Sequence, residues 1–201
     1  MSARNDILNI IRARKGPGLP RPAAYRRQMA GDTVERFVAS ACAANATVER
    51  LGNLTDVPER VARLLRERNL PATVHVPDGS ELVELAWGSV SVSNDAPGPE
   101  DTAVSVAPFG VGESGTLVFP SGKGRPASWH FRPGFEIAIL REEDVVSDLE
   151  SVFAMLHANW PPTLNLVTGP SRTADIEQTL ELGAHGPKAV AILLIRARPA
   201  D

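Results

Sequence analysis

The stretch Phe135-Glu-Ile-Ala-Ile-Leu140 is typical of a buried strand, and the segments after it alternate between helix and strand patterns. The acids of 142–144 suit a helix N-terminus, and the apolar residues of 145–156 recur at helical spacing. Further on, the patterns predict a strand over 164–168, a helix over 173–182 that Gly183 ends, and a last strand over 190–195. These units predict a three-layer α/β fold whose mostly parallel sheet is covered on both faces.

The same alternation extends towards the N-terminus. The patterns predict a helix over 22–45, a strand over 47–50, a helix capped by Thr55 or Asp56 that runs to Glu67, and a strand over 72–76. The less regular middle holds short strands over 90–92, 102–106 and 116–119. Residues 1–24 combine a short apolar stripe with a Pro/Gly-rich run, which predicts an N-terminal helical arm and linker ahead of one domain over 25–201.

Length and composition limit the classes of function. With 201 residues, 43% of them hydrophobic and 22% charged, the chain is typical of a single soluble globular domain. No apolar run approaches the ~20 residues of a membrane span and residues 1–16 lack a signal-peptide core, so we expect a cytoplasmic protein without membrane contact. The basic residues of 1–30 lack interleaved aromatics or a groove-reading motif, which argues against nucleic acid as a partner.

The residues that bind metals and redox centres are sparse. Cys42 is the one cysteine, and an iron–sulfur cluster takes several thiolates. The histidines, at 75, 130, 157 and 185, form no pair at metal-ligand spacing. We therefore expect no metal site and no cofactor held by this chain.

The segment Gly110-Val-Gly-Glu-Ser-Gly115 matches the glycine spacing of a dinucleotide-binding loop, but its context differs. The β-branched and aromatic residues of 116–119 follow it, so the segment predicts strand, turn, strand, with no helix N-terminus to hold a pyrophosphate. The turn presents Glu113 and Ser114 between strands. Glu113 is either a functional acid or a solvated turn residue.

The stretch Asn165-Leu-Val-Thr-Gly-Pro-Ser-Arg-Thr-Ala-Asp-Ile-Glu177 predicts a strand that leads through a Gly-Pro turn into a helix. Free N–H groups at such a helix start accept an anion, and a carboxylate or phosphate is the natural ligand. The same residues also suit a helix cap without any ligand. If the site exists, its contacts come from Ser114, Thr116, Thr168, Gly169, Ser171, Arg172, Thr173, Asp175 and His185. His185 either titrates near neutral pH or hydrogen-bonds its own turn.

Three blocks, 113–118, 165–180 and 182–187, resemble the LUD-domain family, and the resemblance extends over about Val48 to Ile195. It implies the fold of the CoA-transferase and ribose-5-phosphate isomerase type. It also implies a role in organic acid metabolism, the oxidation of L-lactate to pyruvate. This chain would be a clusterless subunit or accessory protein beside iron–sulfur partner proteins, as part of an L-lactate dehydrogenase complex that does not use NAD.

Two points stay open beside this resemblance. The alternative function is a free-standing enzyme of the isomerase or acyl-transferase kind, in which Glu113 acts near the bound anion. The segment Gly122–Glu136 is polar where the family has a leucine- and proline-rich approach to a strand with a histidine near its start. No role is therefore assigned to His130.

Overall fold

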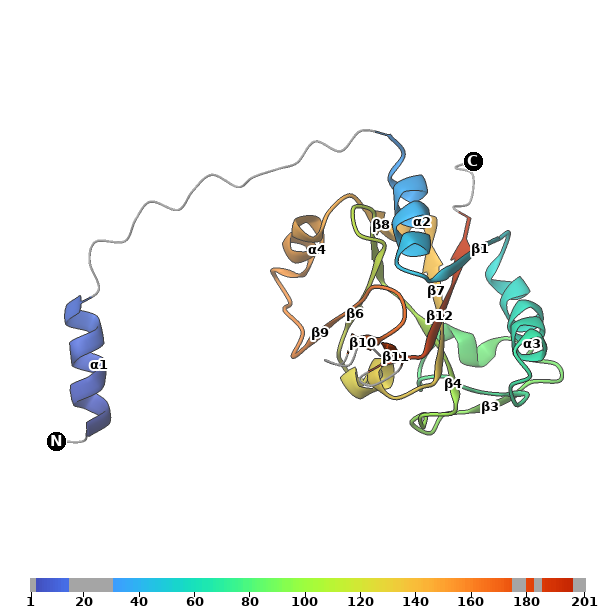
Figure 1. Cartoon of the computed structure of the whole chain (residues 1–201), viewed down its shortest axis with the longest axis horizontal. Coiled ribbons are helices and arrows are strands. Elements are labelled where there is room, and N and C mark those ends of the chain that lie inside the picture. The colour runs from blue at the N-terminus through green and yellow to red at the C-terminus, as the bar shows by residue number, and fades with distance from the viewer. Residues whose placement is uncertain (1–2, 15–30, 175–179, 183–185, 197–201) are drawn as a thin grey trace.

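The computed structural model describes residues 3–14, 31–174, 180–182 and 186–196. Its centre is a six-stranded sheet in which all neighbouring strands are parallel (Figure 1). In spatial order the strands are β1 (Thr47–Leu51), β12 (Ala189–Ile195), β7 (Phe135–Arg141), β4 (Thr102–Val106), β2 (Thr73–His75) and β3 (Ser91–Ser93). The α/β class and the mostly parallel sheet predicted from the sequence are confirmed.

The central strands β7 and β12 are buried on both faces. Ile137 and Ile139 of β7 belong to one apolar cluster, whereas Ala138 and Leu140 belong to another on the opposite side. In β12, residues 190–195 are all buried. Burial on both faces explains why residues 190–195 are a continuous apolar run and why residues 135–140 are apolar except for Glu136.

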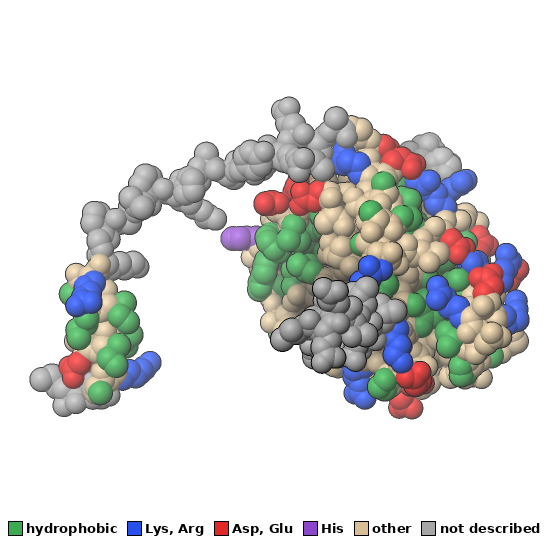
Figure 2. All heavy atoms as spheres, viewed as in Figure 1, with side chains coloured by type: hydrophobic (Ala, Val, Ile, Leu, Met, Phe, Trp, Pro, Cys, Tyr) green, Lys and Arg blue, Asp and Glu red, His purple; other side chains and the backbone are tan. Residues whose placement is uncertain are grey.

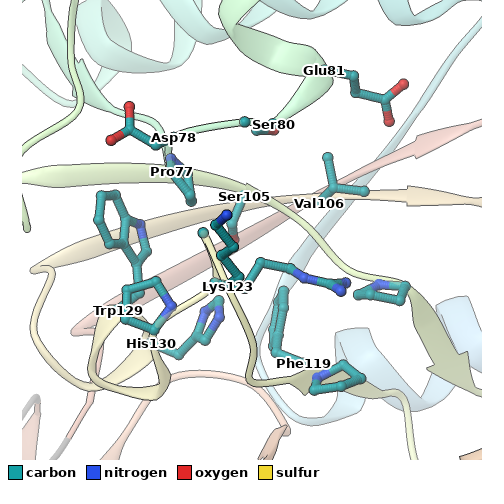
Figure 3. A pocket seen from close by; sticks show the side chains of 16 residues that line it. Pro77, Asp78, Ser80, Glu81, Ser105, Val106, Phe119, Lys123, Trp129 and His130 are labelled. Atoms are coloured by element: carbon teal, nitrogen blue, oxygen red, sulfur yellow. The ribbon is translucent and has the colours of Figure 1, made fainter. Parts of the chain in front are cut away.

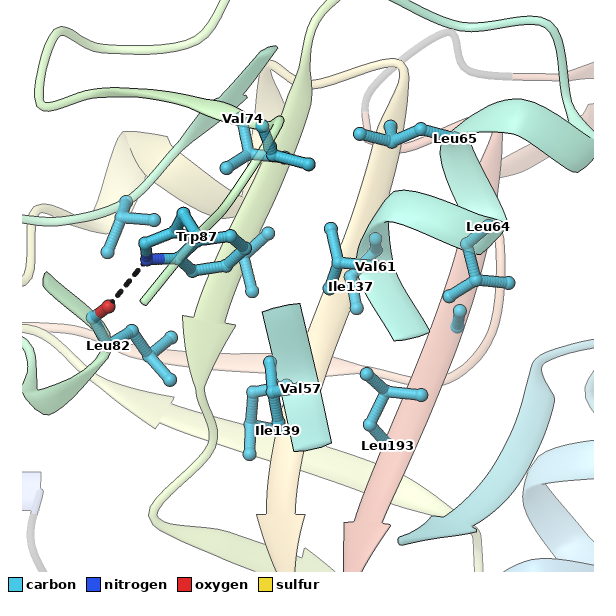
Figure 4. Close-up of a cluster of buried hydrophobic side chains, with 14 of the residues drawn as sticks. Val57, Val61, Leu64, Leu65, Val74, Leu82, Trp87, Ile137, Ile139 and Leu193 are labelled. Atoms are coloured by element: carbon cyan, nitrogen blue, oxygen red, sulfur yellow. Dashed lines mark hydrogen bonds between the residues drawn. The ribbon is translucent and has the colours of Figure 1, made fainter. Parts of the chain in front are cut away.

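Helix α3 (Val57–Glu67) covers the first face of the sheet. Its residues Val61, Leu64 and Leu65 lie at helical spacing on one side and pack against β7 and β12, as Figure 4 shows. Trp87 closes the far end of this cluster, and its indole Nε1 donates a hydrogen bond of 2.8 Å to the carbonyl of Leu82.

Helix α2 (Thr33–Ala43) and a second, four-stranded sheet cover the other face. In spatial order this sheet contains β8 (Val145–Val146), β5 (Phe109–Val111), β6 (Thr116–Pro120) and β9 (Leu164–Val167). Leu117 and Phe119 of β6 face the large sheet, whereas Val118 faces outward, where Val152 of helix α4 (Leu149–Leu156) covers it. The sequence patterns did not separate this second sheet from the first.

Helix α1 (Ala3–Arg14) has no buried residue. No helix in the described part of the chain is long and apolar enough to cross a membrane.

The helix predicted over 173–182 is wrong. β10 (Arg172–Ala174) and β11 (Leu180–Leu182) pair there as an antiparallel ribbon. The apolar residues Leu180 and Leu182 fit the two-residue period of a strand as well as a helical stripe, and helix propensity is weak enough for tertiary context to override it.

The helix predicted to start at the acids of 142–144 begins later. Residues 142–144 form a 3₁₀ turn (η4), and Val145–Val146 pairs in parallel with β5, as β-branched residues favour. Asp148 caps α4 instead, accepting a 2.8 Å hydrogen bond from the Ser151 N–H. Asp56 occupies the N-cap position of α3, as predicted, but its carboxylate accepts the N–H of Asn53 and not one from α3.

An ion pair ties α3 to the edge strand β1. The guanidinium of Arg60 donates to both carboxylate oxygens of Glu49, over 2.5 and 2.6 Å, and also contacts Glu67 at 3.1 Å. The hydrogen bonds from Arg60 lower the pKa of Glu49. A bidentate ion pair of this kind contributes more to stability than an ordinary exposed ion pair does.

We predict that Arg60→Met lowers the free energy of unfolding by about 1–3 kcal/mol at pH 7, because it leaves Glu49 without its cation. The loss should shrink as the pH falls through the lowered pKa of Glu49, since a protonated carboxyl no longer needs the cation. Urea unfolding from pH 7 to pH 3 measures both effects. Arg63→Met, which removes an exposed pair with Glu59, is the control and should cost under about 0.5 kcal/mol. Equal losses in the two variants would contradict the role of Arg60.

Candidate functional site

Three of the site residues predicted from the sequence form a chain of hydroxyl groups. Thr116 is the first residue of β6, and its Oγ1 lies 2.7 Å from the Oγ of Ser114 and 2.7 Å from the Oγ1 of Thr168. Thr168 follows β9, which pairs antiparallel with β6. The antiparallel pairing of β6 and β9 therefore brings Ser114, Thr116 and Thr168 together.

The turn that carries Glu113 connects β5 to β6, so the prediction of strand, turn, strand is confirmed. Glu113 is exposed, and its carboxylate accepts a 3.4 Å hydrogen bond from the N–H of Leu149, the first residue of α4. Glu113 thus faces a helix start, where a carboxylate is electrostatically favoured without any ligand.

The loop after β9 does not form the predicted helix N-terminus. The N–H of Ser171 donates to the carbonyl of Pro187 over 2.9 Å, and Arg172, with an exposed side chain, begins β10. The backbone of Thr173 pairs with Glu181, and nothing is described of its side chain. Asp175 and His185 lie outside the described residues. Binding of an anion by these residues stays a prediction. The helix N–H groups that were expected to hold the anion are not formed, because β10 begins at Arg172.

A cavity of about 400 Å³ lies elsewhere, at the carboxyl ends of β2 and β4. One wall is the loop 77–81 after β2, and another is residues 105–108 at the end of β4. The end of β6, the basic turn 123–125 and the 3₁₀ helix η3 (Ala127–Phe131) complete it. Ligand sites of open α/β sheets commonly lie at this edge.

A buried polar network forms the floor of the cavity. Glu136 in β7 is fully buried, and its Oε1 lies 2.5 Å from Nδ1 of His130 and accepts a 3.2 Å hydrogen bond from Ser105 Oγ. The imidazole stacks on the ring of Phe119, with centroids 3.8 Å apart. Ser105 and His130 line the cavity, with Trp129 beside them (Figure 3).

Two buried polar atoms of this network are left without a hydrogen-bond partner among the described residues. These are Oε2 of Glu136 and the indole Nε1 of Trp129. Most buried polar groups in proteins are paired, and unpaired ones concentrate where a ligand or water completes the network. Oε2 of Glu136 can accept a hydrogen bond, or donate one if the carboxyl group is protonated. The indole N–H of Trp129 can donate one.

Two cations stand over this floor. Residues 122–125 form a tight turn in which Gly122 and Arg125 exchange two backbone hydrogen bonds of 3.0 Å. Lys123 and Arg125 line the cavity, and neither makes an ion pair within the described part of the chain. A Cβ at Gly124 would lie 2.7 Å from the carbonyl of Asp78, so this turn packs closely on the opposite wall.

The acids of that opposite wall differ in their partners. Glu81 forms a 2.7 Å ion pair with Arg141, whereas the carboxylate of Asp78 accepts a 2.6 Å hydrogen bond from the neutral side-chain amide of Asn94. The cavity thus combines two cations that form no ion pair among the described residues with a hydrogen-bonding floor. Such a combination suits a small anion that also carries a hydroxyl or carbonyl group.

The cavity and the predicted site lie at opposite ends of β6. Phe119 borders the cavity, whereas Thr116 belongs to the hydroxyl chain. The two residues are three positions apart in the strand, which corresponds to a distance of ~10 Å. Sequence reasoning therefore missed the cavity residues Ser105, Lys123, Arg125, His130 and Glu136. One signal was available, because Glu136 is a charged residue inside a strand that must be buried on both faces.

Comparison with known proteins adds to this geometry. Residues 99–195 match the LUD domain. This part of the chain, just under half of its length, is similar to the LUD-domain family. The matched part of the LUD domain runs from β4 to β12 and contains all five of the cavity residues that sequence reasoning missed.

Several relatives carry the name lactate utilization protein C. The one from Halalkalibacterium halodurans is 33% identical over 49% of this chain and 45% of its own length, and the one from Geobacillus sp. (strain WCH70) is 30% identical over 69% and 57%. This chain thus spans about half the length of the curated relatives it matches. An uncharacterised protein of Neisseria meningitidis is 26% identical over 100% of this chain and 98% of its own.

A solved structure supports the fold. The crystal structure of a DUF162 family protein from Deinococcus radiodurans superposes with a TM-score of 0.60, over 81% of this chain and 96% of that one. The sequence identity is 18%, so this likeness concerns the fold alone.

Gly169 holds the loop after β9 against the end of α2. Its φ is +68°, and a Cβ there would lie 2.0 Å from the carbonyl oxygen of Ala44. We predict that Gly169→Ala costs about 3–5 kcal/mol of unfolding free energy, because the backbone must move as well as adopt a strained φ. The control Gly88→Ala shares a positive φ, +57°, in open space and should cost only about 1 kcal/mol. Equal losses in thermal or urea unfolding would show that the contact with Ala44 is dispensable.

Proposed function

We propose that this chain works in lactate utilisation by binding a small hydroxy- or oxo-carboxylate in the cavity above Glu136 and His130. The observation that carries the proposal is the pairing of a fully buried carboxylate with an imidazole beneath two cations that form no ion pair among the described residues. The names of the relatives point to lactate, a three-carbon carboxylate with a hydroxyl group at C2.

The cations supply the carboxylate contacts in this proposal. Lys123 and Arg125 come from one short turn, so both can reach the same anion, and Arg125 offers a planar fork that matches a carboxylate. The indole N–H of Trp129 is a further donor beneath them. A cavity of about 400 Å³ is within the usual size range of small-molecule sites.

His130 would contact the C2 substituent. An imidazole that donates its Nδ1–H to Glu136 keeps a lone pair on Nε2, and Nε2 has no partner in the described residues. That atom can accept the hydrogen of a substrate hydroxyl and take the proton when the alcohol is oxidised. Glu136 and the ring of Phe119 then act as positioning groups, because they fix the orientation of the imidazole.

The oxidation of lactate to pyruvate also breaks the C2–H bond, which releases a second proton to water and two electrons. We propose that iron–sulfur partner proteins accept the electrons in the cytoplasm, since Cys42 is the one cysteine of this chain and a cluster takes several. The chain would then be the clusterless component of an L-lactate-oxidising assembly. The exposure of Glu113 at the start of α4 argues against the alternative in which it acts as a base.

Titration calorimetry of the purified chain with L-lactate and with pyruvate tests the binding step. We predict that Lys123→Ala and Arg125→Ala each weaken binding about tenfold or more, since a charge-assisted hydrogen bond contributes about 1.5–3 kcal/mol. Arg63→Ala removes a surface cation from α3 and should leave the affinity unchanged.

Lactate-dependent dye reduction by the chain together with its iron–sulfur partners tests the role in oxidation. The two cation variants should lower this activity, with Arg63→Ala again unchanged. Unaltered binding and activity in Lys123→Ala and Arg125→Ala would exclude the cavity as the site. Loss of binding in Arg172→Ala alone would instead return the site to the loop after β9.

A further inference from the structure

We propose that helix α1 folds back onto an exposed apolar surface beside α4 of the same chain. We call this surface the α4 patch, and it consists of Phe153, Met155, Trp160 and Leu166. The proposal is independent of the cavity and of the function assigned to it.

Helix α1 carries an apolar stripe that no described part of the chain covers. Ile7, Ile10 and Ile11 lie at positions i, i+3 and i+4, and their exposed fractions are 58%, 53% and 59%. Asn5 and Asn9 lie on the opposite side of the helix. A 12-residue helix is marginal in water by itself, so its stability depends on a surface that buries this stripe.

The α4 patch is an apolar surface of matching character. Phe153 and Trp160 lie with ring centroids 5.6 Å apart, and Trp160 is 57% exposed. Leu166, on the outer face of β9, is 46% exposed. Figure 2 shows hydrophobic side chains gathered on the side of the domain where α4 lies. Exposed apolar side chains that gather on one side of a domain mark contact surfaces.

The start of α2 places the arm close to this patch. Thr33 packs against Gly112 and lies near the carbonyl of Val146, the last residue of β8, and α4 begins three residues further along the chain. Residues 15–32, which join α1 to α2, can span up to roughly 60 Å. Because the arm is tethered nearby, its local concentration at the patch is in the millimolar range. This favours the chain's own arm over that of a second copy.

The charges of the two surfaces are complementary. The last turn of α1 carries Arg12 and Arg14. The approach to the patch carries Glu143 and Asp144 in η4 and Glu150 in the first turn of α4. Opposite charges around an apolar contact orient it and raise the rate of docking.

Acrylamide quenching of tryptophan fluorescence tests the docking directly. Trp87 and Trp129 are 8% and 4% exposed, so Trp160 is the tryptophan that the quencher can reach. A docked α1 shields Trp160, and we expect Ile7→Asp/Ile11→Asp to raise the Stern–Volmer constant at least twofold over wild type. The matched control Asn5→Asp/Asn9→Asp adds the same charge to the other side of α1 and should behave as wild type. In Trp160→Phe the difference between the variants should vanish.

A second measurement tests the same contact with a substitution in the α4 patch. Amide hydrogen exchange of residues 3–14 should be faster in Leu166→Asp than in wild type, because the change puts a charge into the surface that holds α1. Equal quenching in the two double variants, or unchanged exchange in Leu166→Asp, would overturn the proposal. Shielding of Trp160 that disappears on dilution together with a dimer in light scattering would also overturn it, since the arm would then come from a second copy.

Discussion

The carboxylate of Glu136 imposes the main constraint on this molecule. It lies fully buried within a sheet strand, where a charge or an unpaired carboxyl is costly unless other groups satisfy it. His130 and Ser105 satisfy one of its oxygens, and both belong to other segments of the chain. The network therefore holds β4, β7 and η3 in a defined arrangement.

Neighbouring contacts support this arrangement. The side chain of Asn165 in β9 donates to the carbonyl of Ala127 over 2.7 Å and fixes the start of η3 against the second sheet. Phe119 also belongs to the second sheet, in β6, and its ring stacks on the imidazole of His130. The two sheets meet along these contacts, and the cavity is the space that their side chains leave unfilled. The turn with Lys123 and Arg125 forms one of its walls.

The sequence predicted the parts of the fold that depend on local patterns. The strands over 135–140 and 190–195 follow from largely apolar runs, and the turn at Gly112–Gly115 follows from the residues around it. The patterns failed where two periods fit equally well, as in the ribbon over 172–182 and at Val145–Val146. The cavity was missed for a related reason. A predicted helix start at Ser171 suggested anion binding, whereas the network of Ser105, His130 and Glu136 depends on the pairing of strands far apart in the sequence.

Nitrogen NMR of ¹⁵N-histidine-labelled protein, titrated with L-lactate, tests most directly whether the pair of His130 and Glu136 is the functional centre. The signals of His130 are assigned with His130→Gln. The account predicts a protonated Nδ1 in the free protein and an Nε2 signal that shifts as lactate binds, with the signals of His75 and His157 unchanged. Saturating lactate that leaves His130 unchanged, or shifts another histidine alone, would contradict it.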